Sequence, residues 1–132
     1  MRIASIVLLG GLVVFALGCG YSSKAPTPQP GVTPAIAQLV PAGANAGAPA
    51  FTLTVNGSSF STTATINWNG AAQNTTHVSA SELTTIISAS DIAKASTVPV
   101  SVTNPATPGM GGIYGTGGTQ AETSNVMNFA VN

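Results

Sequence analysis

The chain has 132 residues, and only 5% of them are charged: three basic and three acidic side chains give a formal net charge of zero. Because no basic stripe is present to neutralise phosphates, the composition argues against nucleic-acid binding. A single cysteine excludes an internal disulfide bond, so stability has to come from burial and backbone pairing.

The amino terminus predicts an export signal. One basic residue, Arg2, precedes an apolar run of 15 residues over positions 3–17. At about 1.5 Å per residue this run covers roughly 22 Å, which is short of the ~30 Å hydrocarbon core of a bilayer. A basic start, a short apolar core and small residues before a cleavage point are the parts of a secretory signal. We therefore expect residues 1–18 to be a signal peptide.

The only cysteine, Cys19, directly follows this run. Residues 15–19, Phe-Ala-Leu-Gly-Cys, resemble the lipobox of bacterial lipoproteins, with Ala16 at the place that usually holds Leu. The resemblance implies cleavage before Cys19 and lipidation of its sulfur, and two or more acyl chains give stable membrane anchoring. Gly20 after the cysteine favours the outer membrane. The alternative is an ordinary cleaved signal, with a free thiol on a periplasmic or secreted protein.

The next segment predicts a tether. Residues 21–34 contain Ser, Thr, Lys and four prolines, with almost nothing apolar to bury. Proline-rich chains favour extended conformations of about 3.1 Å per residue. We expect residues 19–33 to hold a domain away from the membrane, and a leader without a role is the alternative.

Residues 34–132 have a common size for one domain. Apolar residues alternate with polar ones over residues 51–55, 66–68 and 98–102, which is typical of half-buried strands. Further strands are predicted over residues 36–40, 73–78, 83–88 and 126–131, and in the last of these Met127, Phe129 and Val131 share a face.

Turn signals separate these strands, at residues 41–49, at Asn56 and Gly57, at Asn69 and Gly70, and at Asn104 and Pro105. One short helical turn is predicted within residues 89–95, capped by Ser90. About seven short strands without a long helical pattern indicate an all-β fold, an immunoglobulin-like antiparallel β-sandwich. Trp68 is expected near the centre of its core.

The order of these motifs is similar to that of an IPT/TIG domain. The matching parts are residues 34–41 (PAIAQLVP), 51–57 (FTLTVNG) with Phe60, 66–70 (INWNG), Leu83 with Ile86, 100–105 (VSVTNP), and Ser124 and Asn125 with Phe129 and Val131. The resemblance implies an immunoglobulin-like, non-enzymatic module of the kind found in cell-surface receptors and exported bacterial proteins. The nucleic-acid-binding branch of that family depends on basic loops, which this chain lacks.

One segment departs from the family pattern. Residues 105–123 form a 19-residue, glycine-rich stretch where the family usually has a short hairpin. A loop of this length in a compact domain is typically functional or disordered. Met110, Ile113 and Tyr114 are its candidate binding residues, and a mobile connection is the alternative.

The inventory of reactive side chains does not favour an enzyme. A metal site needs several ligands, and the domain offers only His77, Glu82, Asp91 and Glu122. Glu82 and Asp91 could share a calcium ion, although their spacing matches no known binding loop. An exposed or satisfied ring is the expected state of His77. The sequence therefore predicts no catalytic residue, no metal and no cofactor.

Three function classes remain. The favoured one is a lipid-anchored envelope module that serves in binding or as a spacer, with a protein or glycan partner that the sequence does not identify. A carbohydrate-binding accessory module typically presents two or three exposed aromatic side chains in a line, and here only Tyr21, Tyr114 and any outward-facing Phe could serve, which argues against this class. A surface subunit that assembles through sheet edges is the third class.

Overall fold

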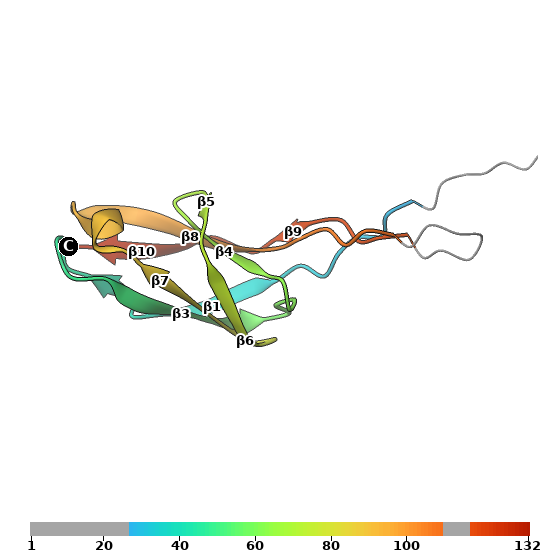
Figure 1. The fold of residues 1–132 in the computed structure, drawn as a ribbon, viewed down its shortest axis with the longest axis horizontal. Helices are drawn as coiled ribbons and strands as arrows, with labels where there is room; N and C mark the ends of the chain where they lie inside the picture. The colour runs from blue at the N-terminus through green and yellow to red at the C-terminus, as the bar shows by residue number, and fades with distance from the viewer. Residues whose placement is uncertain (1–26, 110–116) are drawn as a thin grey trace, which may run out of the picture.

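The computed structural model describes residues 27–109 and 117–132, which form two packed β-sheets (Figure 1). The four-stranded sheet has the order β1 (Ala35–Val40), β3 (Phe51–Ser58), β7 (Glu82–Ile87), β6 (Thr75–Ser79). The six-stranded sheet has the order β2 (Gly43–Ala44), β10 (Met127–Val131), β8 (Ser96–Asn104), β4 (Thr65–Trp68), β5 (Ala71–Ala72), with β9 (Glu122–Thr123) beside β8. These named strands pair antiparallel, except that β10 and β2 are parallel.

This topology is immunoglobulin-like. Among the described residues, seven strands are four or more residues long, namely β1, β3, β4, β6, β7, β8 and β10. In chain order, the first, second, fifth and fourth of them form one sheet, and the third, sixth and seventh lie in the other. That is the ABED and CFG division of an immunoglobulin domain. The predicted immunoglobulin-like β-sandwich of about seven strands is therefore confirmed.

The inward faces of both sheets supply one hydrophobic core. Trp68 is only 3% exposed, and its ring lies 5.0 Å from that of Phe129 at an interplanar angle of 59°. Phe129 also stacks on Phe51, with a centroid distance of 5.6 Å. Aromatic pairs of this kind add about 0.5–1.5 kcal/mol beyond the burial of their area. The central position expected for Trp68 is confirmed.

Side chains also join the two sheets at their margins. Where the chain passes from β5 to β6, the Thr75 hydroxyl accepts a 2.8 Å hydrogen bond from the Ile66 amide and donates a 3.0 Å bond to the Gln73 carbonyl. At the opposite margin, the Asn125 side chain accepts from the Ile36 amide at 2.8 Å and donates to the Ile36 carbonyl at 3.1 Å. Asn125 thus pairs with β1 as a strand backbone would.

One predicted turn is present and another is wrong. Asn69 and Gly70 have φ angles of 51° and 81° between β4 and β5, the backbone that a tight hairpin requires. Asn56 and Gly57 instead lie inside β3, because β1 pairs with them there. A Cβ at position 57 would collide with the carbonyl of Ala35 and the ring of Phe60, so close packing explains this glycine.

The short helical turn is also placed differently from the prediction. A 3-10 helix, η1 (Ala89–Ile92), begins after Ser88, which is the N-cap in place of the predicted Ser90. Asp91 makes Ser88 the N-cap, because its carboxylate accepts hydrogen bonds from the Ser88 amide at 3.3 Å and from the Ser88 hydroxyl at 2.6 Å. Ile92 is fully buried and ties the turn to the core. Within the described residues, no helix has the length and apolar character needed to cross a membrane.

Candidate functional site

The residues with the most specific sequence predictions lie outside the described part of the chain. Cys19, the predicted lipidation site, belongs to the undescribed segment 1–26. Met110, Ile113 and Tyr114, the candidate binding residues, belong to segment 110–116. Both remain predictions.

The four candidate metal ligands lie in separate places. Glu82 begins β7 and Asp91 follows the end of that strand, so about 17 Å of extended chain separates them and they cannot share a calcium ion. Glu122 accepts a 3.3 Å hydrogen bond from the Thr33 hydroxyl. His77 lies half-buried in β6, opposite Leu83, and its Nε2 atom is buried without a hydrogen-bond partner. Over residues 27–109 and 117–132, no three such side chains cluster.

The structure instead shows a projecting arm, which consists of three segments, residues 29–33, 105–109 and 117–123. Segments 105–109 and 117–123 pair with each other. The Thr107 amide donates to the Thr119 carbonyl at 3.1 Å, and the Thr119 amide donates to the Thr107 hydroxyl at 2.9 Å. The arm extends from the end of the sandwich opposite the C-terminus (Figure 1).

The N-terminal segment forms the third part of this arm. The Gln29 amide donates to the Gly118 carbonyl at 2.8 Å, and the Gln29 carbonyl accepts from the Gln120 amide at 2.9 Å. Gly31 lies so close to this pair of segments that a Cβ there would come within 2.9 Å of the Glu122 side chain and would collide with the Gln120 carbonyl. Residues 29–33 are thus fitted against residues 117–123 within the arm.

Asn104 holds the base of the arm to the sandwich. Its side chain accepts from the Ser61 amide at 2.9 Å and donates to the carbonyls of Val32 at 2.7 Å and Ser59 at 2.8 Å. Asn104 itself is 6% exposed, so its side chain is shielded from water, and the three bonds are part-buried. These three hydrogen bonds are the role of the Asn at the end of β8. They fix the direction in which the arm leaves the domain.

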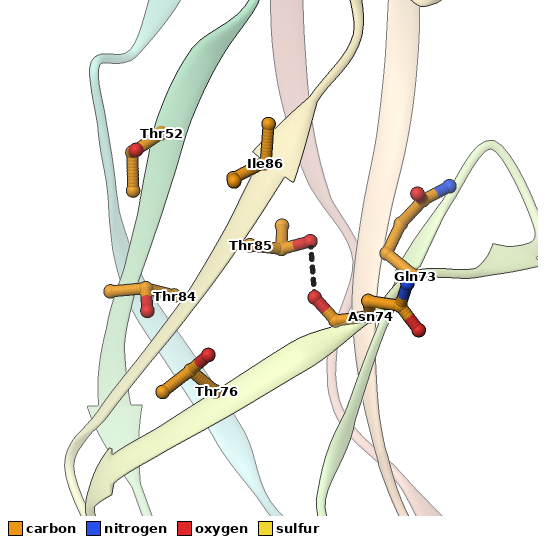
Figure 2. A pocket seen from close by; sticks show the side chains of 7 residues that line it. All are labelled: Thr52, Gln73, Asn74, Thr76, Thr84, Thr85 and Ile86. Atoms are coloured by element: carbon orange, nitrogen blue, oxygen red, sulfur yellow. Dashed lines mark hydrogen bonds between the residues drawn. The ribbon is translucent and has the colours of Figure 1, made fainter.

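A hollow of about 420 Å³ lies over β3, β6 and β7, on the outer side of the four-stranded sheet (Figure 2). We call it the threonine hollow. Its lining consists of Thr52, Gln73, Asn74, Thr76, Thr84, Thr85 and Ile86. Among these residues one side-chain hydrogen bond forms, a 2.9 Å bond from the buried Thr85 hydroxyl to the Asn74 carbonyl.

A second hollow, of about 340 Å³, lies beside the β4–β5 turn and η1. Trp68, Asn69, Asp91 and Ser96 are among its lining residues. Trp68 is committed to the core and Asp91 to Ser88, which leaves few free groups for a ligand. The threonine hollow is therefore the better candidate for binding.

The sequence predictions missed both the arm and the threonine hollow. Alternation within each strand does place Thr52, Thr76 and Thr84 on outward faces, but it does not say which strands are neighbours. In the structure Thr84 lies opposite Thr76 on β6, and Thr52 on β3 lies opposite Ile86, two residues further along β7, which brings outward threonines from three strands to one hollow.

Comparison with known proteins adds no relative. No protein-family profile, curated protein or solved structure matches the chain. The functional argument therefore depends on the fold, the arm and the chemistry of the surface.

Proposed function

We propose that the protein is a non-enzymatic, lipid-anchored component of the cell envelope that presents one immunoglobulin-like domain, for binding or as a spacer. Two resemblances support this proposal, that of residues 15–19 to a lipobox and that of residues 34–132 to an IPT/TIG domain. The confirmed fold is the one that the second resemblance implies.

The geometry of the arm is the observation on which the proposal depends most. Gln29 is bonded to the outer part of the arm, whereas the C-terminus lies at the opposite end of the elongated molecule (Figure 1). Gln29 comes ten residues after Cys19, and ten extended residues span at most about 36 Å. An anchor at Cys19 would therefore keep the arm near the membrane and direct η1 and the C-terminus away from it.

The arm also limits how freely an anchored domain could turn. A fully flexible tether of residues 19–33 would leave the orientation of the sandwich open. Because Gln29 is hydrogen-bonded to Gly118 and Gln120, and the Val32 carbonyl to Asn104, residues 29–33 do not act as a flexible tether. This arrangement suits a module that presents one end of a domain to the surroundings.

The anchor can be tested by mass spectrometry and fractionation of the full chain expressed in a bacterium. We expect a mature amino terminus at Cys19 with its sulfur acylated, and loss of Cys19→Ala from the membrane fraction. The matched control is Ser22→Ala, which leaves the cysteine in place and should stay in the membrane. An unprocessed chain, or equal membrane recovery of Cys19→Ala, would overturn the proposal.

The orientation can be tested separately on the lipoprotein bound to vesicles. Because acylation blocks the thiol of Cys19, a cysteine introduced at Thr107 or at Asn132 can be labelled alone with a fluorophore. We expect a quencher attached to lipid headgroups to quench the label at position 107 more strongly than the label at position 132. Equal quenching, or the reverse order, would contradict the proposed orientation.

A further inference from the structure

We propose that the threonine hollow binds a neutral sugar unit of a glycan. This inference goes beyond presentation of the domain and does not depend on the anchor at Cys19. It is carried by the shape of the hollow, its free hydroxyl groups, its lack of charge and one exposed apolar side chain.

The hydroxyl groups form the polar part of the site. Figure 2 shows Thr52, Thr76 and Thr84 around the hollow, with no side-chain hydrogen bond drawn among them. Thr84 and Thr76 lie directly opposite each other on neighbouring strands, which are about 4.8 Å apart. Each hydroxyl can donate one hydrogen bond and accept two, which is also the capacity of each hydroxyl of a sugar. A row of such groups therefore matches a polyhydroxylated ring.

The walls of the hollow are held in place by the fold. Thr85 is only 4% exposed, and its hydroxyl fixes the backbone at Asn74 by the 2.9 Å bond to the carbonyl. This bond positions the Gln73–Asn74 segment, which carries two side-chain amides, at one side of the hollow. A volume of about 420 Å³ lies within the range of small-molecule sites.

The charge distribution favours a neutral ligand. The charged side chains of the described residues are Glu82, Asp91, Lys94 and Glu122, and none of them lines the hollow. A phosphate, a carboxylate or an ammonium group would have no ion-pair partner there. A ligand that relies on hydroxyl and amide hydrogen bonds does not need one.

No aromatic side chain among those that the structure describes lines the hollow, so Ile86 supplies the apolar contact. It is 70% exposed, lies beside the hollow and is paired with Thr52 across the β3–β7 ladder. A sugar ring carries C–H groups on its faces as well as hydroxyls on its rim. Ile86 can pack against such a face while the threonines bond to the rim.

An extended peptide added to the edge of β6 is the main competing occupant. A peptide that extends a sheet needs a regular strand edge. The pairing of β6 with β7 is interrupted by a register shift between His77 and Ser79, which leaves little regular edge in a strand of five residues. This irregularity favours a ligand in the hollow over a strand at the edge.

The test is methyl NMR on the full chain in zwitterionic micelles, which avoids sugar-based detergents. The probes are cellotetraose and fully N-acetylated chitotetraose as neutral glycans, oligogalacturonate as an acidic one, and an uncharged Ser/Thr/Val heptapeptide. We expect at least one neutral glycan to shift the methyl signals of Thr52, Thr76, Thr84 and Ile86 and no distant methyl signals.

Removal of the Thr84 hydroxyl tests the site more sharply than the methyl shifts do. A net hydrogen bond corresponds to about a three- to tenfold change in affinity, so Thr84→Val should weaken binding of the neutral glycan by that factor. The control is Thr97→Val, an exposed threonine of β8 on the other sheet, which should leave affinity unchanged. A thermal melt of each variant checks that the fold is intact.

Four outcomes would overturn the inference. They are the absence of methyl shifts with both neutral glycans, equal or stronger binding of oligogalacturonate, shifts at β6 with the peptide alone, and unchanged affinity in Thr84→Val.

Discussion

Asn104 and Val32 lie 72 residues apart in the chain, and the side-chain amide of the first donates a 2.7 Å hydrogen bond to the carbonyl of the second. The same amide group also bonds to the carbonyl of Ser59, and its oxygen accepts from the amide of Ser61. One buried side chain therefore holds together the N-terminal segment, the β3–β4 connection and the end of β8. The direction of the arm depends on this contact.

Substitution of Asn104 should destabilise the domain. Asn104→Ala leaves two carbonyls and one amide without their partner at a part-buried place, and a fully buried unsatisfied group costs about 1–3 kcal/mol. Allowing for water entry, we expect the free energy of unfolding to fall by about 2–4 kcal/mol, measured by urea denaturation of the full chain. Asn128→Ala, at an exposed position of β10, is the control and should stay within about 0.5 kcal/mol of the parent.

Removal of the core indole should have the largest effect. Trp68→Ala deletes a side chain that is 3% exposed and its contact with Phe129, which should cost about 3–5 kcal/mol. Val126→Ala, at a side chain that is 61% exposed, should change the melting temperature little. An unchanged melt in the Trp68 variant would show that the indole is not in the core.

The contact of Thr75 with both sheets provides a matched pair of variants. Thr75→Val removes the acceptor of the Ile66 amide and the donor to the Gln73 carbonyl, so we expect a loss of about 1–3 kcal/mol. Thr76→Val changes the next residue, which is exposed and faces away from the core. Its unfolding midpoint should match that of the parent, and equal losses in the two variants would contradict the role of Thr75.

The fit of the N-terminal segment to the arm can be tested at Gly31. Gly31→Val places side-chain atoms against Gln120 and Glu122, and should displace residues 29–31 while Val32 stays bonded to Asn104 and the core is undisturbed. We expect faster hydrogen exchange at the amides of Gln29 and Gln120, which bond across this interface, with little change in the melting temperature. Val32→Ala, at a side chain that is 67% exposed, is the control. Unaltered exchange at both amides in Gly31→Val would mean that the segment is not packed as described.

The β4–β5 turn tests a purely local effect. Gly70 has a φ of 81° and open space around the place of a Cβ, so Gly70→Ala is opposed by backbone conformation alone. The left-handed region costs an L-residue about 1–2 kcal/mol. Gly47→Ala, with a φ of 75° and the same open space, should show a similar loss. A much larger loss at position 70 would indicate a further role for that turn.

Several features could be predicted from local sequence because their cause is local. Alternation of apolar and polar residues in the segments around Leu53, Val100 and Phe129 is enough to define strands with one buried face. The Asn69–Gly70 turn was predictable because both residues tolerate positive φ. The two errors, at Asn56 with Gly57 and at Ser90, have a common origin, because a longer-range contact outweighed a local preference in each case. Pairing with β1 keeps Asn56 and Gly57 in a strand, and the Asp91 carboxylate makes Ser88 the N-cap in place of Ser90.

By itself, then, the sequence determined the all-β class, the seven longer strands and the place of Trp68, because each follows from side-chain periodicity and size. Only the tertiary structure decided that residues 29–33 lie along the arm and that Thr52, Thr76 and Thr84 surround one hollow. Both arrangements depend on hydrogen bonds and strand neighbours far apart in the chain. No short stretch of sequence carries that information, since the partner that satisfies a backbone group is chosen by the packing of the whole domain.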